Sequence, residues 1–216
     1  MFLFPIAKPQ GCDIQTFYGT NGVILNSWNK PVGVSHVYMM LIGPGGNGDG
    51  TNGGGSGAVT VWYGAAQHVP DSLVIQAGTG AAGTSSFVYF RSRSTSIVAL
   101  LEANCAIAAP TGGPAMPANQ FTASGFFQST AGQDGGSTIT ASATTFLSGG
   151  GGSSDPITAN YGYSLPATAG NFVGRFQMQP IIVGLGSKGT ARGAIGCGGG
   201  LTSGTGGPGM VLIASW

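Results

Sequence analysis

Charged residues are scarce in this chain. Of its 216 residues, seven are lysine or arginine and six are aspartate or glutamate, which gives a net charge of +1. Nucleic-acid backbones are bound by clusters of basic side chains, so this balance excludes a protein that holds nucleic acid on a basic face. Designed soluble monomers carry charge on roughly 25–35% of their surface residues. The low charge therefore indicates a protein that is part of an assembly.

Long hydrophobic runs are missing too. The segment Met1–Pro9 is apolar, but prolines interrupt it, it has no basic beginning, and it is too short for a signal peptide or a membrane span. We therefore expect no membrane insertion, and we interpret residues 1–18 as an N-terminal arm that docks onto a neighbouring protein. The apolar residues that would make this contact are Met1, Phe2, Leu3, Phe4 and Ile6.

The residues that catalysis and metal binding require are few and scattered. The chain has two histidines, His36 and His68, and its six acidic residues lie in six separate segments, so no catalytic triad or carboxylate pair is indicated. Its three cysteines have neither CxxC nor zinc-ligand spacing, and we interpret them as small buried hydrophobes: Cys12, Cys105 and Cys197. We predict no catalytic residue, no cofactor and no metal.

Two glycine-containing segments imitate ligand-binding motifs. Gly78–Gly83 matches GxGxxG, but a strand-like segment follows it where a dinucleotide site needs a helix, and such matches arise by chance in a glycine-rich chain. Asn47–Gly53 places oxygen-bearing side chains at intervals, as a calcium loop does, but Ala58 stands where that loop needs glutamate. We interpret the second segment as a polar turn.

Glycine and proline are what the chain has in excess, with 42 and 12 residues. Such a share often marks disorder, but 42% of the residues are hydrophobic, so the chain can fold. Ordering a glycine costs about 0.5–1 kcal/mol more than ordering an alanine, which sums to roughly 20–40 kcal/mol over the chain. Burial between subunits would offset part of this cost. We therefore expect an obligate homo-oligomer.

Short hydrophobic segments alternate with glycine runs. Each is rich in valine, isoleucine or aromatic residues and is bounded by turn residues, which predicts strands. The predicted strands are Gly22–Ser27, His36–Ile42, Ala58–Tyr63, Ser72–Ala77, Ser86–Phe90, Ile181–Val183 and Met210–Ser215. Thr95–Ala109 could form an amphipathic helix or a strand, and its surroundings favour the strand. The chain is predicted to be all-β.

The glycine runs lie between these strands, at Gly43–Gly57, Gly149–Gly152 and Gly196–Gly209. They could be flexible linkers, or they could pack closely as extended left-handed helices of the polyglycine II kind. Hydrophobic strands adjoin the runs, which favours packing. Residues from about 110 to 163 are rich in small residues and are interpreted as a loop-rich insertion in a glycine-rich β domain over 19–216.

One order of segments carries a family resemblance. It consists of Trp28–Val34, the strand His36–Ile42, the run Gly43–Gly46, the element Gly83–Phe87, and the closing run and strand Gly206–Ile213. This order resembles the glycine-rich domain of tail-fibre and other virion surface proteins of bacterial viruses. The resemblance covers nearly the whole of residues 19–216. It implies a jelly-roll-like β-sandwich with glycine-rich loops, in a symmetric oligomer such as a homotrimer.

The resemblance also implies a function. The chain would be a non-enzymatic virion structural protein, a spike, fibre tip or capsid-decorating protein, made in the host cytoplasm and exposed on the virion surface for host attachment. Its partners would be copies of itself, other virion proteins bound through the arm, and a host surface glycan or protein. Candidate receptor contacts are Tyr161, Tyr163, Phe126 and Phe127, which could instead fill the core or a subunit interface. The alternative is a subunit of a cellular extracellular filament or adhesin.

Overall fold

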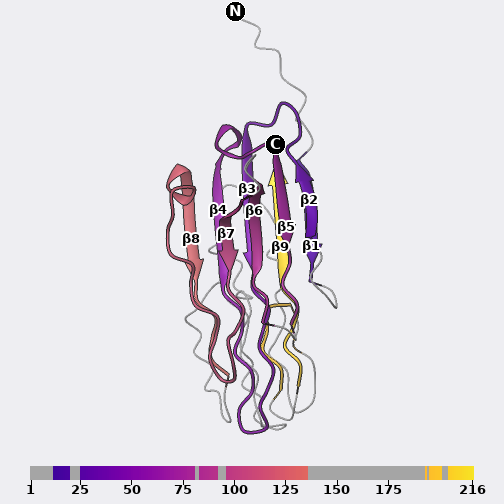
Figure 1. The fold of residues 1–216 in the computed structure, drawn as a ribbon, viewed down its shortest axis with the longest axis vertical. Coiled ribbons are helices and arrows are strands. Elements are labelled where there is room, and N and C mark those ends of the chain that lie inside the picture. Colours follow the sequence, from indigo (N-terminus) through magenta and orange to yellow (C-terminus); the bar gives the residue numbers. More distant parts are fainter. Residues whose placement is uncertain are drawn as a thin grey trace, which may run out of the picture.

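The fold is an all-β arrangement in a computed structural model that describes residues 12–19, 25–80, 83–91, 96–135, 193, 195–200 and 204–216. These residues form nine strands and two short 3-10 helices (Figure 1). The strands are β1 (Asp13–Tyr18), β2 (Leu25–Asn29), β3 (His36–Ile42), β4 (Val59–Ala65), β5 (Ser72–Gln76), β6 (Ser86–Arg91), β7 (Ile97–Ala103), β8 (Gly125–Thr130) and β9 (Met210–Ser215). The 3-10 helices are η1 (Ala66–His68) and η2 (Thr122–Ser124).

The described strands form two antiparallel sheets. The five-stranded sheet has the order β1-β9-β3-β4-β8, and the four-stranded sheet has the order β2-β5-β6-β7. The two sheets face each other, and one hydrophobic core takes residues from both. The sandwich-like all-β fold predicted from the sequence is confirmed. The segment that could have been helix or strand contains β7 and is a strand.

The core between the sheets follows the alternation of side chains along each strand. Val37, Met39 and Leu41 point inward from β3 and are fully buried, as are Leu73 and Ile75 of β5. Two tryptophans add the largest buried surfaces: Trp28 in β2 and Trp62 in β4. The Trp62 ring stacks on Phe121 with ring centroids 4.7 Å apart.

A second apolar cluster covers the other face of the five-stranded sheet. It contains Met40 and Ile42 of β3, Val59 and Val61 of β4, and residues of β9, and all of them are buried. Tyr38 lies at its border, and burial raises the pKa of its phenol to about 12. The central strands are thus apolar on both faces, which explains why their sequences are nearly continuous hydrophobic runs instead of alternating ones.

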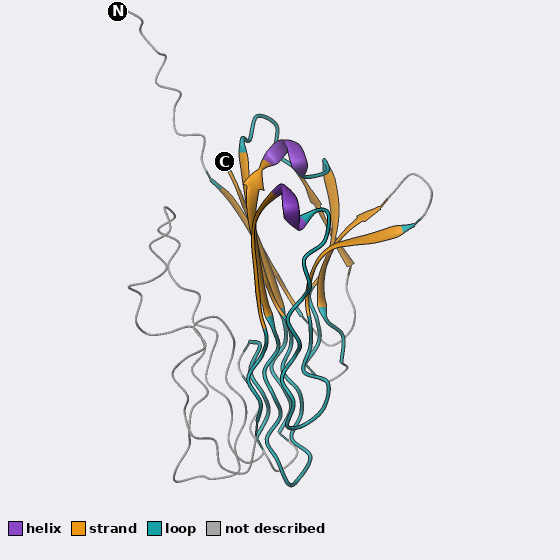
Figure 2. Cartoon of the chain, turned by 90° about the vertical axis from the view of Figure 1, so that its left-hand side faces the viewer, coloured by secondary structure: helices purple, strands orange, loops and turns teal. Residues whose placement is uncertain are grey.

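Glycine segments continue from the ends of β3, β4 and β9 as extended chains that run side by side (Figure 2). The N–H groups of Gly43 and Gly46 donate to Ala58 and Gly55, whereas those of Gly45 and Gly48 donate to Gly207 and Gly204. A further pair follows the same rule, because Gly54 donates to Gly199 and Gly57 donates to Gly196. Donors three residues apart therefore face the same neighbour. This is the repeat of a left-handed extended helix with three residues per turn.

We call this region, residues 43–57, 196–200 and 204–209, the glycine bundle, and at many of its glycines the packing leaves no room for a side chain. A Cβ atom on Gly45 would overlap the Cys197 carbonyl, and one on Gly57 would overlap the Gly43 carbonyl. Similar overlaps with backbone atoms occur at Gly54, Gly80 and Gly206. The described glycine segments are therefore packed and hydrogen-bonded, as in the packed alternative, and they are not free linkers. The run at 149–152 lies outside the described residues.

The structure also contains strands that the sequence pattern did not indicate. Asp13–Tyr18 lies in the predicted N-terminal arm, yet it forms β1 and pairs along its length with β9. Gly125–Thr130 lies in the predicted loop-rich insertion, yet it forms β8 and pairs with β4. The predicted strand Ile181–Val183 falls outside the described residues.

Candidate functional site

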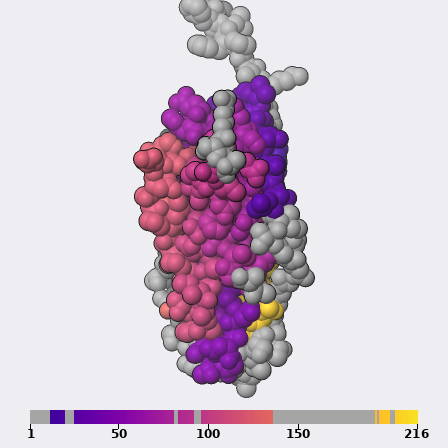
Figure 3. All heavy atoms as spheres, viewed as in Figure 1, coloured from indigo at the N-terminus to yellow at the C-terminus, as the bar shows by residue number. Residues whose placement is uncertain are grey.

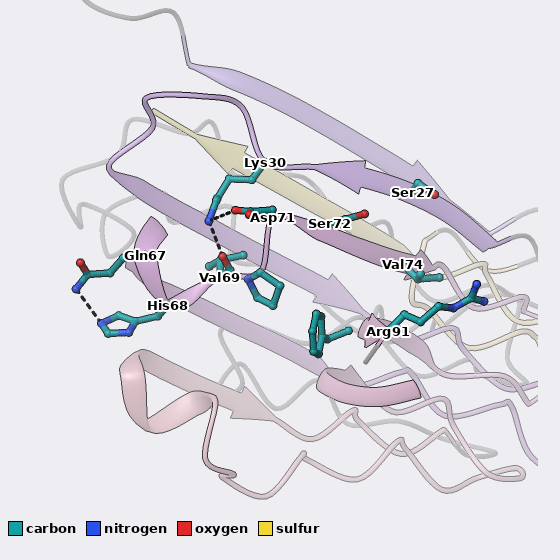
Figure 4. A pocket seen from close by; sticks show the side chains of 11 residues that line it. Ser27, Lys30, Gln67, His68, Val69, Asp71, Ser72, Val74 and Arg91 are labelled. Atoms are coloured by element: carbon teal, nitrogen blue, oxygen red, sulfur yellow. Dashed lines mark hydrogen bonds and ion pairs between the residues drawn. The ribbon is translucent and has the colours of Figure 1, made fainter. Parts of the chain in front are cut away.

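A surface groove of about 870 Å³ lies at the end of the sandwich that is remote from the glycine bundle. The glycine bundle adjoins the end of β3 and the beginning of β4. The groove is bordered by the segment that follows β4 and therefore lies at the opposite end of that strand. Eleven residues line it, from β2, β5 and β6 and from the segment between β4 and β5 (Figure 4). In the space-filling view, sandwich and bundle form one continuous elongated surface (Figure 3).

Lys30 fixes one wall of the groove. Its ammonium group donates to the carbonyl oxygens of Ala66 and Val69 at 3.1 and 2.7 Å, and it lies 2.9 Å from Oδ1 of Asp71. The backbone N–H of Lys30 also donates to the Asp71 carbonyl oxygen. All three ammonium donors are thus occupied by the segment between β4 and β5. The Lys30 side chain is 17% exposed and that of Asp71 is 94% exposed, so the lysine holds the segment while the carboxylate faces solvent.

Arg91 occupies the other part of the groove, at the end of β6. Figure 4 shows it near Val74 at one end, with Gln67 and His68 at the other end. Lys30 and Arg91 are the only lysine and arginine among the described residues, and both line this groove. Within the described part of the chain, Lys30 forms an ion pair with Asp71, and Arg91 forms none. The groove therefore holds one exposed guanidinium that no carboxylate of the described residues contacts.

Aromatic side chains gather on both sheets. His36, Tyr63 and Trp216 lie at one end of the five-stranded sheet with nearly parallel rings and mutual centroid distances of 5.6 to 6.0 Å. On the four-stranded sheet, Phe87 and Tyr89 stack at 4.8 Å. Burial raises the pKa of Tyr89, and the nearby Glu102 carboxylate adds to this effect.

Glu102 is a half-buried acid on β7. Burial raises the pKa of its carboxyl group, and a hydrogen bond from Ser85 opposes part of this effect. Its backbone carbonyl accepts a bond of 2.6 Å from the Thr60 hydroxyl of the facing sheet. The Glu102 backbone therefore belongs to the contact between the sheets.

The predicted receptor residues do not form one surface. Phe126 and Phe127 are neighbours in β8 and point to opposite faces: Phe126 is 59% exposed, whereas Phe127 packs against the core. Their strand partners are Tyr63 and Trp62. The other two, Tyr161 and Tyr163, lie outside the described residues. So do the residues of the predicted docking contact, Met1, Phe2, Leu3, Phe4 and Ile6.

The segment that imitates a calcium loop is an ordinary turn. The Asp49 carboxylate accepts the backbone N–H groups of Thr51 and Asn52 at 2.8 and 2.6 Å, and these bonds lower the pKa of the exposed carboxyl group. The polar-turn interpretation fits this geometry. In the described residues, no group of three or more histidine, cysteine or acidic side chains could hold a metal ion. All three cysteines are free thiols, but only Cys197 is buried as predicted, because Cys105 is half-buried and Cys12 is exposed.

Sequence reasoning missed the groove because its members are far apart. Lys30 and Arg91 are separated by sixty positions, and nothing in the pattern around them indicates that β2 and β6 flank β5. His68 was singled out only as a possible catalytic base and is an exposed residue of η1.

No protein-family model matches the chain, and a search of curated proteins finds no match. Among the described residues, no helix has the length and hydropathy needed to cross a membrane.

Proposed function

We propose that the chain is a non-enzymatic structural protein of a bacterial virus particle, a spike, fibre tip or capsid-decorating protein, exposed on the virion surface and serving host-cell attachment. The proposal rests on the resemblance of the segment order to glycine-rich virion surface domains and on one structural observation, the glycine bundle. A part of the chain that carries almost no side chains contributes little chemistry. It can contribute stiffness.

The bundle supports this role through its hydrogen bonds. Each described segment donates to more than one neighbour, so that 43–48 is bonded both to 54–58 and to 204–207. Buried backbone groups must find partners, and here other backbone groups supply them without side chains. Such cross-bonded chains resist bending in every direction. A stiff projection suits a particle that must hold a contact away from its shell.

The edges of the sheets support self-association. The edge strands β1, β8, β2 and β7 contain no lysine, arginine or proline, the residues that usually protect exposed edges from pairing. Large apolar side chains stand exposed on them, namely Ile14, Tyr18, Leu25, Ile97, Val98 and Phe126. Partner copies in a homo-oligomer would cover these edges, and other virion proteins could bind the N-terminal arm.

Fractionation of infected cells tests the proposal. Antibodies against the recombinant chain should detect it in purified particles at a constant number of copies per particle, and they should reduce adsorption of the particles to host cells. Sedimentation of the recombinant chain should give an oligomer at micromolar concentration.

Two results would contradict the proposal. The first is a chain that stays with soluble host proteins and never co-sediments with particles. The second is its presence on the surface of uninfected cells, which would favour the cellular filament or adhesin.

A further inference from the structure

The groove at the end of the sandwich has a ligand chemistry of its own. We propose that it binds an acidic saccharide, with the Arg91 guanidinium holding the sugar carboxylate and the partly buried Val74, on the same face of the four-stranded sheet, contacting the ring. This inference rests on host attachment as the proposed function and names the class of host molecule that the site would take.

Charge distribution is the first argument. The described residues contain two lysine or arginine side chains, and both line this groove. Lys30 is occupied by Asp71 and two carbonyl oxygens, whereas Arg91 has no ion pair among the described residues. A guanidinium presents paired N–H groups that match the two oxygens of a carboxylate. The groove therefore offers an anion one strong and directional contact.

The remaining lining favours a sugar over a small inorganic anion. Half-buried Val74 and Pro70 give apolar surface, and Gln67, Ser27 and Ser72 bring hydrogen-bonding groups to the rim. A mixture of apolar surface with a few polar groups is typical of organic-ligand sites, and pyranose rings present both an apolar face and hydroxyl groups. Phosphate would need several converging donors, and the groove offers only one exposed guanidinium.

The shape of the groove suits one part of a longer chain. It is open to solvent and has a volume of about 870 Å³, so neighbouring sugar units could extend beyond it. Its wall is already formed in the free protein, because Lys30 ties down the segment between β4 and β5. A preformed site loses less conformational entropy on binding than one that must be ordered.

Titration of the full recombinant chain with defined oligosaccharides tests the site. The probe is tetragalacturonic acid, and the matched neutral probe is its methyl ester, which keeps the sugar and removes the charge. Isothermal titration at 150 mM salt should show saturable binding of the acid. The dissociation constant of the ester should be at least about tenfold higher than that of the acid. Inorganic phosphate at equal concentration should not displace the acid.

Variants distinguish specific binding at Arg91 from a general effect of the protein's charge. Arg91→Gln should weaken binding of the acid by about tenfold or more. Arg91→Lys should retain part of the affinity, because it keeps the positive charge but loses the paired N–H groups of the guanidinium. Asp49→Asn is the matched control, since it also changes one charge but does so in the turn of the glycine bundle, remote from the groove. Its dissociation constant should equal that of the wild type. Circular dichroism confirms that each variant is folded.

Several outcomes would overturn the inference: equal affinity for acid and ester, an Arg91→Gln variant that binds like the wild type, or no binding of the acid at 10 mM. Displacement of the acid by phosphate alone, with the same dependence on Arg91, would assign the groove to phosphate. None of these results bears on whether the chain sits in the particle, which fractionation decides separately.

Discussion

Replacing Gly57 by alanine is expected to destabilise the protein strongly, although the change adds a single methyl group. The new Cβ would overlap the carbonyl group and Cα of Gly43, which are backbone atoms and cannot rotate away. The two segments must separate, and this weakens the bonds from Gly57 N–H to Gly196 and from Gly43 N–H to Ala58, now 2.9 and 2.8 Å long.

The magnitude follows from three contributions. Overpacking costs about 2 kcal/mol, and the two weakened hydrogen bonds cost about 1 kcal/mol each. Alanine restricts the unfolded chain more than glycine does, which returns about 0.5–1 kcal/mol. The free energy of unfolding should therefore fall by about 3 kcal/mol, which for a chain of this size lowers the melting temperature by about 6–12 °C.

Gly46→Ala is the matched control for this variant. Gly46 lies in the same segment and donates a similar bond of 2.9 Å to Gly55, but its Cβ would meet the side-chain Cβ of Ala106 at 3.1 Å. Its neighbour can yield by a few tenths of an ångström, so the stability should change by less than about 1 kcal/mol. Urea unfolding of both variants measures the difference. Equal stabilities within 0.5 kcal/mol would refute close backbone packing as the reason for glycine in the bundle.

Three other predictions concern the sandwich. Lys30→Met should lower the free energy of unfolding by about 1–3 kcal/mol, because the carbonyl groups of Ala66 and Val69 lose their donor. Asp71→Asn changes an exposed position, so its free energy of unfolding should stay within about 1 kcal/mol of the wild type. Urea unfolding measures both values. Gly64→Ala places a Cβ 2.5 Å from Trp62 Cζ2, so near-ultraviolet circular dichroism should report a displaced indole and stability should fall by about 1–3 kcal/mol. The pKa of Glu102 is raised by burial, so the folded state keeps this proton to higher pH than the unfolded state does. The stability that protonated Glu102 contributes is fully present below pH 4.5, the ordinary pKa of a glutamate. It is lost as the pH rises through the higher pKa of the folded state. The urea concentration at the unfolding midpoint should therefore depend less on pH in the Glu102→Gln variant than in the wild type. An equal pH dependence in the two proteins would contradict the raised pKa of Glu102.

The sequence predicted much of the sandwich because its central strands are long apolar runs. His36–Ile42 and Met210–Ser215 form strands with the predicted bounds. Both are buried on two faces, so their hydrophobicity is continuous, and a glycine marks one limit of each, Gly43 after Ile42 and Gly209 before Met210. The strands at the two edges of this sheet were missed. β1 and β8 are half exposed, and their mixed composition becomes a strand pattern only beside β9 and β4.

The candidate site could not be predicted in the same way. A groove is made by residues from separate strands, and its composition depends on strand order, which local patterns do not encode. The order β2-β5-β6 brings Ser27, Val74 and Arg91 to one surface. The aromatic pair Phe126 and Phe127 shows a second limit of sequence patterns. It stood out in the sequence, but adjacent strand residues point to opposite faces, so only one of the two is exposed.

The three-residue repeat of the glycine bundle has a consequence for how such a chain can change in length. Inserting one residue between Gly45 and Gly48 would turn every later N–H by a third of a revolution, so that it would face a different neighbour. Inserting three residues would turn each later donor back toward its original neighbouring segment, and adding three residues to the neighbouring segments as well would lengthen the projection by one turn. The turn at residues 47–52 is closed by Asp49, and it can accept such additions without disturbing the sheets. The reach of the projection can therefore be changed in steps of three residues while the sandwich stays as it is.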